Sequence, residues 1–279
     1  MEKKEDLVTI ITLNYNNPFL KDAIDSVLSQ TYESIQYILL DDGSKKFNSD
    51  QIKQYINCHK KENLKEFIVL KNEKNIGTVK SANRAYSYAK GKYIFNLAGD
   101  DVFYDSHVIR DWVNCFIETG GQVITAYRAV YDEKLEKEIN ILPEEKDVFL
   151  LKYGTQKQVW DALCEKNFIF GCSTARTKEC YQKSEGYSET YKYIEDYPWN
   201  LKVIRHGTQI VFWNRIVLKY RLGGKSSPSK FDIAYLKDSI LILIKEILPY
   251  SKHRKKDVKD FARWVYWHIR LKYKNSTRF

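Results

Sequence analysis

Short apolar runs alternate with helical stripes over the first hundred residues of the chain. Runs at residues 7–13, 35–40, 66–70 and 92–97 predict four strands. After the first, Asn17 and Pro18 predict the start of a helix. Its buried stripe is Leu20, Ala23, Ile24, Val27 and Leu28. Residues 78–89 predict a further helix, which Gly91 ends. Alternating strands and helices predict an α/β fold with a mostly parallel sheet between two layers of helices.

The pattern loosens after residue 105. Segments 107–117 and 196–206 predict helices, and segments 122–131 and 209–220 predict strands. Residues 132–145 predict a charged, mobile excursion, and residues 168–187, rich in small and polar side chains, predict a loop. From residue 232 the chain turns helical to its end. The sequence therefore predicts a large α/β domain followed by a helical extension.

Composition narrows the class of protein. With 43% hydrophobic and 29% charged residues in 279, the chain can bury a normal core. No run approaches the roughly 20 apolar residues of a membrane span, and the amino terminus has no signal-peptide pattern, so we expect a cytoplasmic protein. Five scattered cysteines without a CxxC pair predict reduced thiols rather than disulfides or a zinc site.

The positive charge is concentrated in the tail. Residues 251–279 hold ten Lys and Arg against two Asp, a net charge of +8 out of +10 for the chain. A nucleic-acid enzyme would spread basic groups over a binding face, so we expect no nucleic-acid partner. Aromatic residues such as Phe261, Trp264 and Trp267 accompany the charge. They favour an amphipathic helix on the anionic inner face of the plasma membrane. The alternative is packing on the domain or on a second subunit of a homodimer.

Polar clusters end all four predicted strands. The apolar runs stop in LNYNN, LDDGS, KNEKNIG and NLAGDD. Ligands of open α/β sheets bind outside the carboxyl ends of the strands, so the four clusters predict one composite site. Adjacent Asp100 and Asp101 repel each other unless a cation compensates them, which predicts Mn²⁺ or Mg²⁺ there. A solvated turn is the alternative, but Asp41 and Asp42 repeat the arrangement at another strand end.

The sequence resembles the family 2 glycosyltransferases of the GT-A fold over roughly residues 7–225. The segments that carry the resemblance are NYNNPFLKDAIDSVLSQTY, ILLDDGSKK, NEKNIGTVKSANRAYSYAKGKYIFNLAGDD and YIEDYPWNLKVIRHG. It implies inverting transfer of one sugar from a nucleoside diphosphate sugar to a saccharide or lipid-linked acceptor of a bacterial surface polysaccharide. It also implies a glycosyltransferase domain at 1–225, with a donor half at 1–105 and an acceptor half at 106–225, and a basic helical extension at 226–279.

The resemblance assigns the nucleotide to the first two strand ends. Tyr15 would stack near the base, and Asn14 would shape that pocket. Asp42 would hydrogen-bond the base with support from Asp41. An acidic acceptor opposite an imide N–H favours uracil, so the expected donor is a UDP-sugar.

The same resemblance assigns the diphosphate end of the donor. Asp101 would coordinate the metal, and Asp100 would contact the ribose or a metal-bound water. Gly77 would allow close backbone approach, and Asn83 would brace the donor loop. The chain reads Ser81-Ala82-Asn83 where the family commonly has Ala-Arg-Asn, so Lys80 is the candidate for the missing positive charge.

The Glu195-Asp196 pair matches the family's acidic motif. Inverting transfer needs a carboxylate that removes the acceptor proton, which assigns Asp196 as general base; a helix N-cap is the alternative. Tyr197 and Trp199 are candidates for stacking on an acceptor ring or for the core. The segment YRLGGKSS resembles the loop that closes over the pyrophosphate in this family, where Arg221 and Lys225 would neutralise the leaving group. A basic surface turn is the alternative.

Two other functions use similar residues. A nucleotidyltransferase would also need paired aspartates and a divalent ion, and a non-catalytic sugar-binding protein would keep the fold. The near-neutral charge of residues 1–250 and the acidic motif disfavour the nucleotidyltransferase. Intact Asp42, Asp101 and Asp196 disfavour the second.

Overall fold

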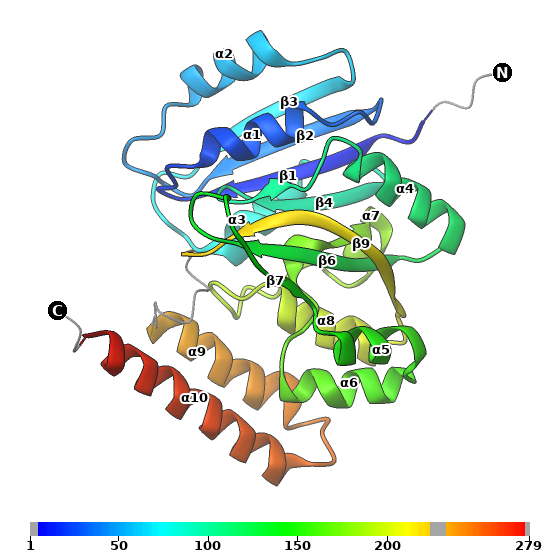
Figure 1. Cartoon of the computed structure of the whole chain (residues 1–279), viewed down its shortest axis with the longest axis vertical. Coiled ribbons are helices and arrows are strands. Elements are labelled where there is room, and N and C mark those ends of the chain that lie inside the picture. The colour runs from blue at the N-terminus through cyan, green and yellow to red at the C-terminus, as the bar shows by residue number, and fades with distance from the viewer. Residues whose placement is uncertain (1–4, 224–232, 277–279) are drawn as a thin grey trace.

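In the described part of the chain, nine strands form one curled sheet with helices on both faces (Figure 1). The structure is a computed structural model that describes residues 5–223 and 233–276. The strand order is β3-β2-β1-β4-β8-β6-β9-β5, and β7 pairs with β6. The predicted α/β architecture of three layers is confirmed.

The first half of the chain supplies four parallel strands. These are β1 (Val8–Asn14), β2 (Ile35–Asp41), β3 (Leu64–Lys71) and β4 (Tyr93–Ala98). They are connected through α1 (Leu20–Leu28), α2 (Ser49–His59) and α3 (Thr78–Tyr86). All four strands were predicted. Strands β1, β2 and β4 are buried on both faces, so each appears in the sequence as a continuous apolar run.

The buried stripe of α1 is also confirmed, but the helix begins at Leu20, later than expected. Asn17 still acts as a local acceptor, since its side chain accepts a hydrogen bond of 2.8 Å from the Phe19 N–H.

The strands of the second half of the chain run in mixed directions. Its strands are β5 (Val102–Phe103), β6 (Val123–Tyr131), β7 (Glu138–Leu142), β8 (Thr174–Thr177) and β9 (Ile210–Arg221). Strand β6 is parallel to β9 and antiparallel to β8, which is antiparallel to β4. The helices are α4 (Val108–Thr119), α5 (Glu145–Tyr153), α6 (Gln156–Glu165), the 3-10 turn η1 (Gly171–Ser173), α7 (Lys178–Lys183) and α8 (Asp196–Arg205).

Two sequence expectations fail in this half. Residues 132–145 contain β7, and residues 168–187 contain η1, β8 and α7 instead of a loop. Strand β8 has the sequence TART, with polar residues at buried positions. Its hydrogen-bonding partners β4 and β6 lie far away in sequence, so local hydrophobic pattern carries no signal for it.

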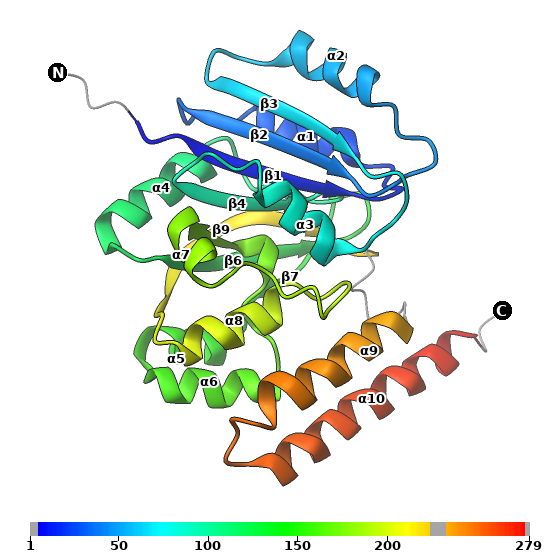
Figure 2. The ribbon, with the colours of Figure 1, turned by 180° about the vertical axis from the view of Figure 1, so that it is seen from behind.

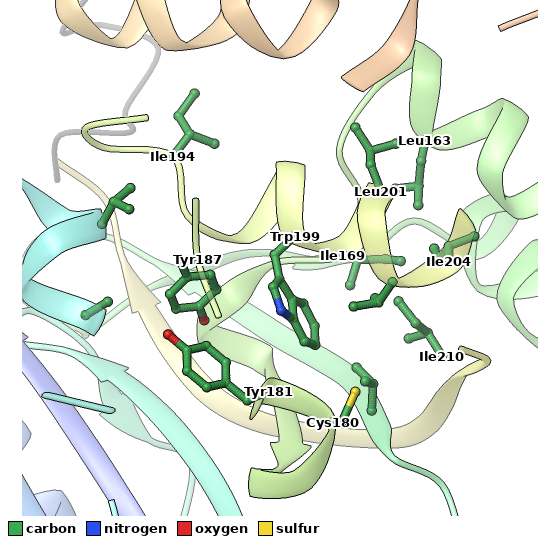
Figure 3. Packing of buried hydrophobic residues seen from close by; sticks show 14 of the residues in the cluster. Leu163, Ile169, Cys180, Tyr181, Tyr187, Ile194, Trp199, Leu201, Ile204 and Ile210 are labelled. Atoms are coloured by element: carbon green, nitrogen blue, oxygen red, sulfur yellow. The ribbon is translucent and has the colours of Figure 1, made fainter. Parts of the chain in front are cut away.

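Separate hydrophobic clusters cover the two faces of the sheet. On one face, residues of α1, α2 and α4, such as Ile24, Ile56 and Trp112, pack against the strands. On the other face, α3 and α8 contribute residues such as Ala82 and Leu201. Figure 3 shows Trp199 and Leu201 of α8 among the buried residues of this second cluster.

The chain ends in a helical hairpin. Helix α9 (Ile233–Ile242) continues into the π-helix η2 (Leu243–Ile247) and is followed by α10 (Arg254–Ser276). Both views show α9 and α10 side by side at the end of the molecule away from β2 and β3 (Figures 1 and 2), where α10 contacts α6 and η2 contacts α8. This confirms the predicted helical extension, while a domain boundary after residue 225 stays a prediction. No helix in the described ranges is long and apolar enough to span a membrane.

Candidate active site

A cavity of about 920 Å³ opens at the carboxyl ends of the parallel strands. The turn after β1, Asp42 after β2, Asn75 after β3 and Gly99 to Asp101 after β4 all line it. The four polar strand ends thus share one cavity, as the sequence predicted. The cavity continues past α8 to the C-terminal hairpin.

Asp41 fixes the geometry of the first strand ends. Its buried carboxylate accepts hydrogen bonds from Asn14 Nδ2 (2.6 Å), Ser44 N (2.8 Å) and Ser44 Oγ (2.5 Å). Tyr15 lies next to this network on the cavity wall and is 39% exposed. The stacking of a base on Tyr15 stays a prediction.

Asp42 lies on the cavity wall and holds the loop after β3. Its carboxylate accepts hydrogen bonds from Asn72 Nδ2 (2.8 Å), Ile76 N (2.8 Å) and Gly77 N (2.9 Å). Gly77 has a φ of 95°, and a Cβ there would lie 2.6 Å from the Lys192 carbonyl oxygen. The close approach expected of Gly77 is therefore made to the backbone that precedes α8.

Two further predicted donor-site residues do not line the cavity in the described part of the chain. Asn83 binds the second half of the chain, with Oδ1 accepting from Tyr181 Oη at 2.6 Å and Nδ2 donating to the Tyr187 carbonyl at 2.8 Å. Lys80 Nζ lies 3.8 Å from Glu189 Oε2, and Lys80 is not among the described residues that line the cavity. Lys225 lies outside the described residues.

Asp101 has the chemistry of a metal ligand. The side chain is fully buried, and its Oδ1 accepts a 2.9 Å hydrogen bond from Arg221 N. Its Oδ2 has no hydrogen-bond partner in the described part of the chain. Burial, and then the charge of Asp100, raise the pKa of Asp101 well above the usual range. A divalent cation would satisfy the unpaired oxygen and both charges, so the two carboxylates fit Mn²⁺ or Mg²⁺.

Arg221 holds this acidic turn in place. It is the last residue of β9, and its Nε donates to the Asp100 carbonyl at 2.8 Å while Nη2 binds Asp22 at 2.8 Å. The guanidinium also lies 3.8 Å from the Phe19 ring centre. Arg221 therefore links a strand, α1 and the Asp100-Asp101 turn; its contact with a leaving group stays a prediction.

Asp196 lines the same cavity from the start of α8. Its Oδ2 accepts from Gly171 N at 2.8 Å, and its Oδ1 accepts from Tyr197 N at 2.7 Å. The N-cap alternative is wrong, because the N-cap is Glu195 and makes no side-chain capping bond. Burial is the largest cause that raises the pKa of both Glu195 and Asp196, and the Asp196 charge raises that of Glu195 further.

Sequence reasoning missed two arginines. Arg128 of β6 lines the cavity, with its guanidinium carbon 3.6 Å from the ring centre of Phe170 and 4.2 Å from that of Tyr220. Its charge offsets part of the rise that burial causes in the pKa of Asp101 and of Asp196. Arg176 of β8 is fully buried, and it donates to Tyr187 Oη at 2.6 Å. A lone Arg in a strand has no motif around it, so no sequence signal marks either residue.

The two aromatic residues beside the acidic motif have different environments. Trp199 is a core residue that is 2% exposed and donates to Ser184 Oγ at 2.7 Å (Figure 3). Tyr197 lines the cavity, and its hydroxyl donates to the Leu163 carbonyl.

Comparison with known proteins agrees with this geometry. The profile of the family described as Glycosyl transferase family 2 matches residues 8–181. An uncharacterized glycosyltransferase of Methanocaldococcus jannaschii is 26% identical over 273 residues, which cover 95% of this chain and 85% of that protein.

Solved structures show the same fold. S. aureus TarS 1–349 in complex with UDP-GlcNAc has a TM-score of 0.66 at 15% identity, over 96% of this chain and 74% of that one. The chain spans 43% of a longer TarS structure. The mannosyltransferase PcManGT of Pyrobaculum calidifontis, in complex with GDP-Man and Mn²⁺, has a TM-score of 0.64 at 13% identity, over 95% and 71% of the two chains. With the family profile covering more than half of its residues, the chain belongs to glycosyl transferase family 2 and is a glycosyltransferase of the GT-A fold.

Proposed function

We propose that the protein transfers a single sugar, with inversion, from a UDP-sugar to a saccharide or lipid-linked acceptor of a bacterial surface polysaccharide. One observation carries the proposal: Asp101, with its unpaired buried oxygen, and Asp196, with its raised pKa, line one cavity. The solved relatives that hold UDP-GlcNAc or GDP-Man support a nucleotide-sugar donor.

The donor would lie across the strand ends. The base would stack on Tyr15, and the Asp42 carboxylate, which also holds the Ile76 and Gly77 N–H groups, would accept its imide N–H. Asp100 and Asp101 would hold Mn²⁺ or Mg²⁺, which supplies positive charge to the diphosphate leaving group. Arg128 would add a second positive charge near the reaction centre.

Asp196 would act on the acceptor. As an acceptor hydroxyl oxygen forms its bond to the anomeric carbon, the bond from that carbon to the diphosphate oxygen breaks, and the hydroxyl proton moves to the Asp196 carboxylate. The N–H groups of Gly171 and Tyr197 hold this carboxylate in one orientation. Burial raises its pKa, which makes it a stronger base than a solvated aspartate.

A screen of nucleotide sugars tests the proposal. We expect one UDP-sugar to be hydrolysed to UDP in the presence of Mn²⁺ or Mg²⁺, with loss of activity in excess chelator. Full activity in chelator would contradict the metal assignment. Release of pyrophosphate from a nucleoside triphosphate, with no hydrolysis of any UDP-sugar, would favour a nucleotidyltransferase instead.

A further inference from the structure

The end of the cavity farthest from the strand ends is built by the C-terminal hairpin. Residues of α9, η2 and α10 line it together with Tyr197. We name this end the hairpin subsite and define it by Tyr197, Tyr235, Leu243, Asp257, Phe261 and Trp264. Most of these side chains are aromatic or apolar, and Asp257 is the charged group among them.

The hairpin is fixed relative to the catalytic carboxylate. Asp238 of α9 is buried, and its Oδ2 accepts hydrogen bonds from the backbone N–H groups of Lys192 (2.9 Å), Tyr193 (2.6 Å) and Ile194 (3.2 Å). These three residues lead directly into the Glu195-Asp196 pair. On the other helix, Lys256 of α10 forms an ion pair with Glu165 of α6. A ligand held by the hairpin is therefore held at a defined position from Asp196.

Asp257 is an unsatisfied group that points to a ligand. It is 5% exposed and lines the cavity, and its Oδ2 has no hydrogen-bond partner within residues 5–223 and 233–276. A buried acceptor without a donor destabilises the folded state. A ligand hydroxyl would supply the missing donor, whereas an anionic ligand group would be repelled.

The aromatic residues of α10 separate into two groups. The rings of Phe261 and Trp264 lie 5.6 Å apart at an interplanar angle of 28°, and both line the cavity. Tyr266 and Trp267, only a few residues further, are 63% and 62% exposed. Flat apolar surfaces beside one hydrogen-bond acceptor match a sugar ring, which has an apolar C–H face and hydroxyl donors at its edge.

We propose that the hairpin subsite binds the acceptor as a neutral sugar ring. The ring packs on Phe261 and Trp264, one hydroxyl donates to Asp257 Oδ2, and another hydroxyl is presented to Asp196. This inference rests on the proposed function and adds the class of acceptor and the residues that select it. The extension after residue 225 then forms part of the active site.

A different role for Asp257 makes the opposite prediction about stability. Asp257 lies in the first turn of α10, where a negative charge interacts favourably with the helix dipole. If that were its function, Asp257→Asn and Asp257→Leu would lower the melting temperature. If the function of the Asp257 carboxylate is to bind a ligand, both variants should melt above the wild type and should bind the acceptor less well.

The test uses the full chain, the UDP-sugar found by hydrolysis, Mn²⁺, and octyl glycosides of glucose, galactose and N-acetylglucosamine as acceptors. We expect at least one glycoside to increase UDP release above hydrolysis. Trp264→Ala and Asp257→Asn should each raise the KM for that glycoside by about tenfold, the loss of roughly one good contact. Trp264→Phe should restore most of the affinity, and Trp267→Ala is the matched control on the exposed side of α10.

The outcomes separate this inference from the proposed function. If no glycoside accelerates UDP release, or if Trp264→Ala and Asp257→Asn keep the wild-type KM, the hairpin subsite is not the acceptor site. A lower melting temperature of Asp257→Leu would also refute it. If no nucleotide with Mn²⁺ raises the melting temperature of the wild type and no UDP-sugar is hydrolysed, the proposed function fails and this inference fails with it.

Discussion

Asp101→Asn should stabilise the metal-free protein and abolish its response to metal. The Asn side chain keeps an oxygen for the Arg221 N–H, which Asp101 Oδ1 accepts at 2.9 Å. It removes the buried negative charge beside Asp100, while Nδ2 takes the place of Oδ2, which has no partner in the described residues. Leaving a buried charge without a hydrogen-bond partner costs at least as much as leaving a neutral group unsatisfied, about 1–3 kcal/mol. For a chain of this size, each kcal/mol raises the melting temperature by about 2–4 °C.

The gain in stability should depend on pH. The pKa of Asp101 is raised in the folded state, by burial first and then by Asp100. Folding is therefore favoured by the protonated form, and this contribution is complete below the unfolded pKa of about 4 and lost as pH rises through the folded pKa. The variant should exceed the wild type most at alkaline pH, and the difference should shrink as the pH falls.

With metal present, the wild type should have the higher melting temperature of the two proteins. A ligand present at 100 times its Kd stabilises the folded state by about 2.7 kcal/mol. With Mn²⁺ and UDP the wild type should gain about that amount and the variant much less. Differential scanning fluorimetry in chelator and in Mn²⁺ with UDP measures both effects. The reasoning is refuted if the variant melts below the wild type in chelator, or if both proteins gain equally from metal and UDP.

Three further predictions concern the base, the missed arginine and the tail. Asp196→Asn should lower transfer by about 10²–10⁴-fold with unchanged UDP affinity by calorimetry; near-normal transfer would remove Asp196 from the role. Arg128→Met removes a cation that lowers the pKa of Asp101 and Asp196, so the acid limb of the pH profile of kcat/KM should move to higher pH; an unmoved limb would contradict this. If the basic tail binds membranes, each cation adds about 1 kcal/mol near an anionic surface. Replacing Arg254, Lys255 and Lys259 with Gln should then weaken sedimentation with acidic vesicles, as should added salt; equal sedimentation of both proteins would exclude it.

The parallel strands of the first hundred residues and the place of the site could be predicted from the sequence alone. Strands β1, β2 and β4 are buried on both faces, so each must be a short apolar run, and its first polar residue marks the carboxyl edge of the sheet. Because parallel strands end at the same edge, Asn14, Asp42 and Asp101 had to line a common cavity. Local pattern is sufficient there because the signal lies within each strand.

The other groups that surround that edge are brought there by tertiary contacts. Strand β8 exists because β4 and β6 complete its hydrogen bonds, and the guanidinium of Arg128 packs on the rings of Phe170 and Tyr220 at the cavity. Asp257 is 61 residues away from Asp196 in the chain, yet it lines the same cavity because Asp238 and Lys256 hold the hairpin in place. Such contacts join residues distant in sequence, and their energy comes from burial and charge in the folded state, which no local pattern records.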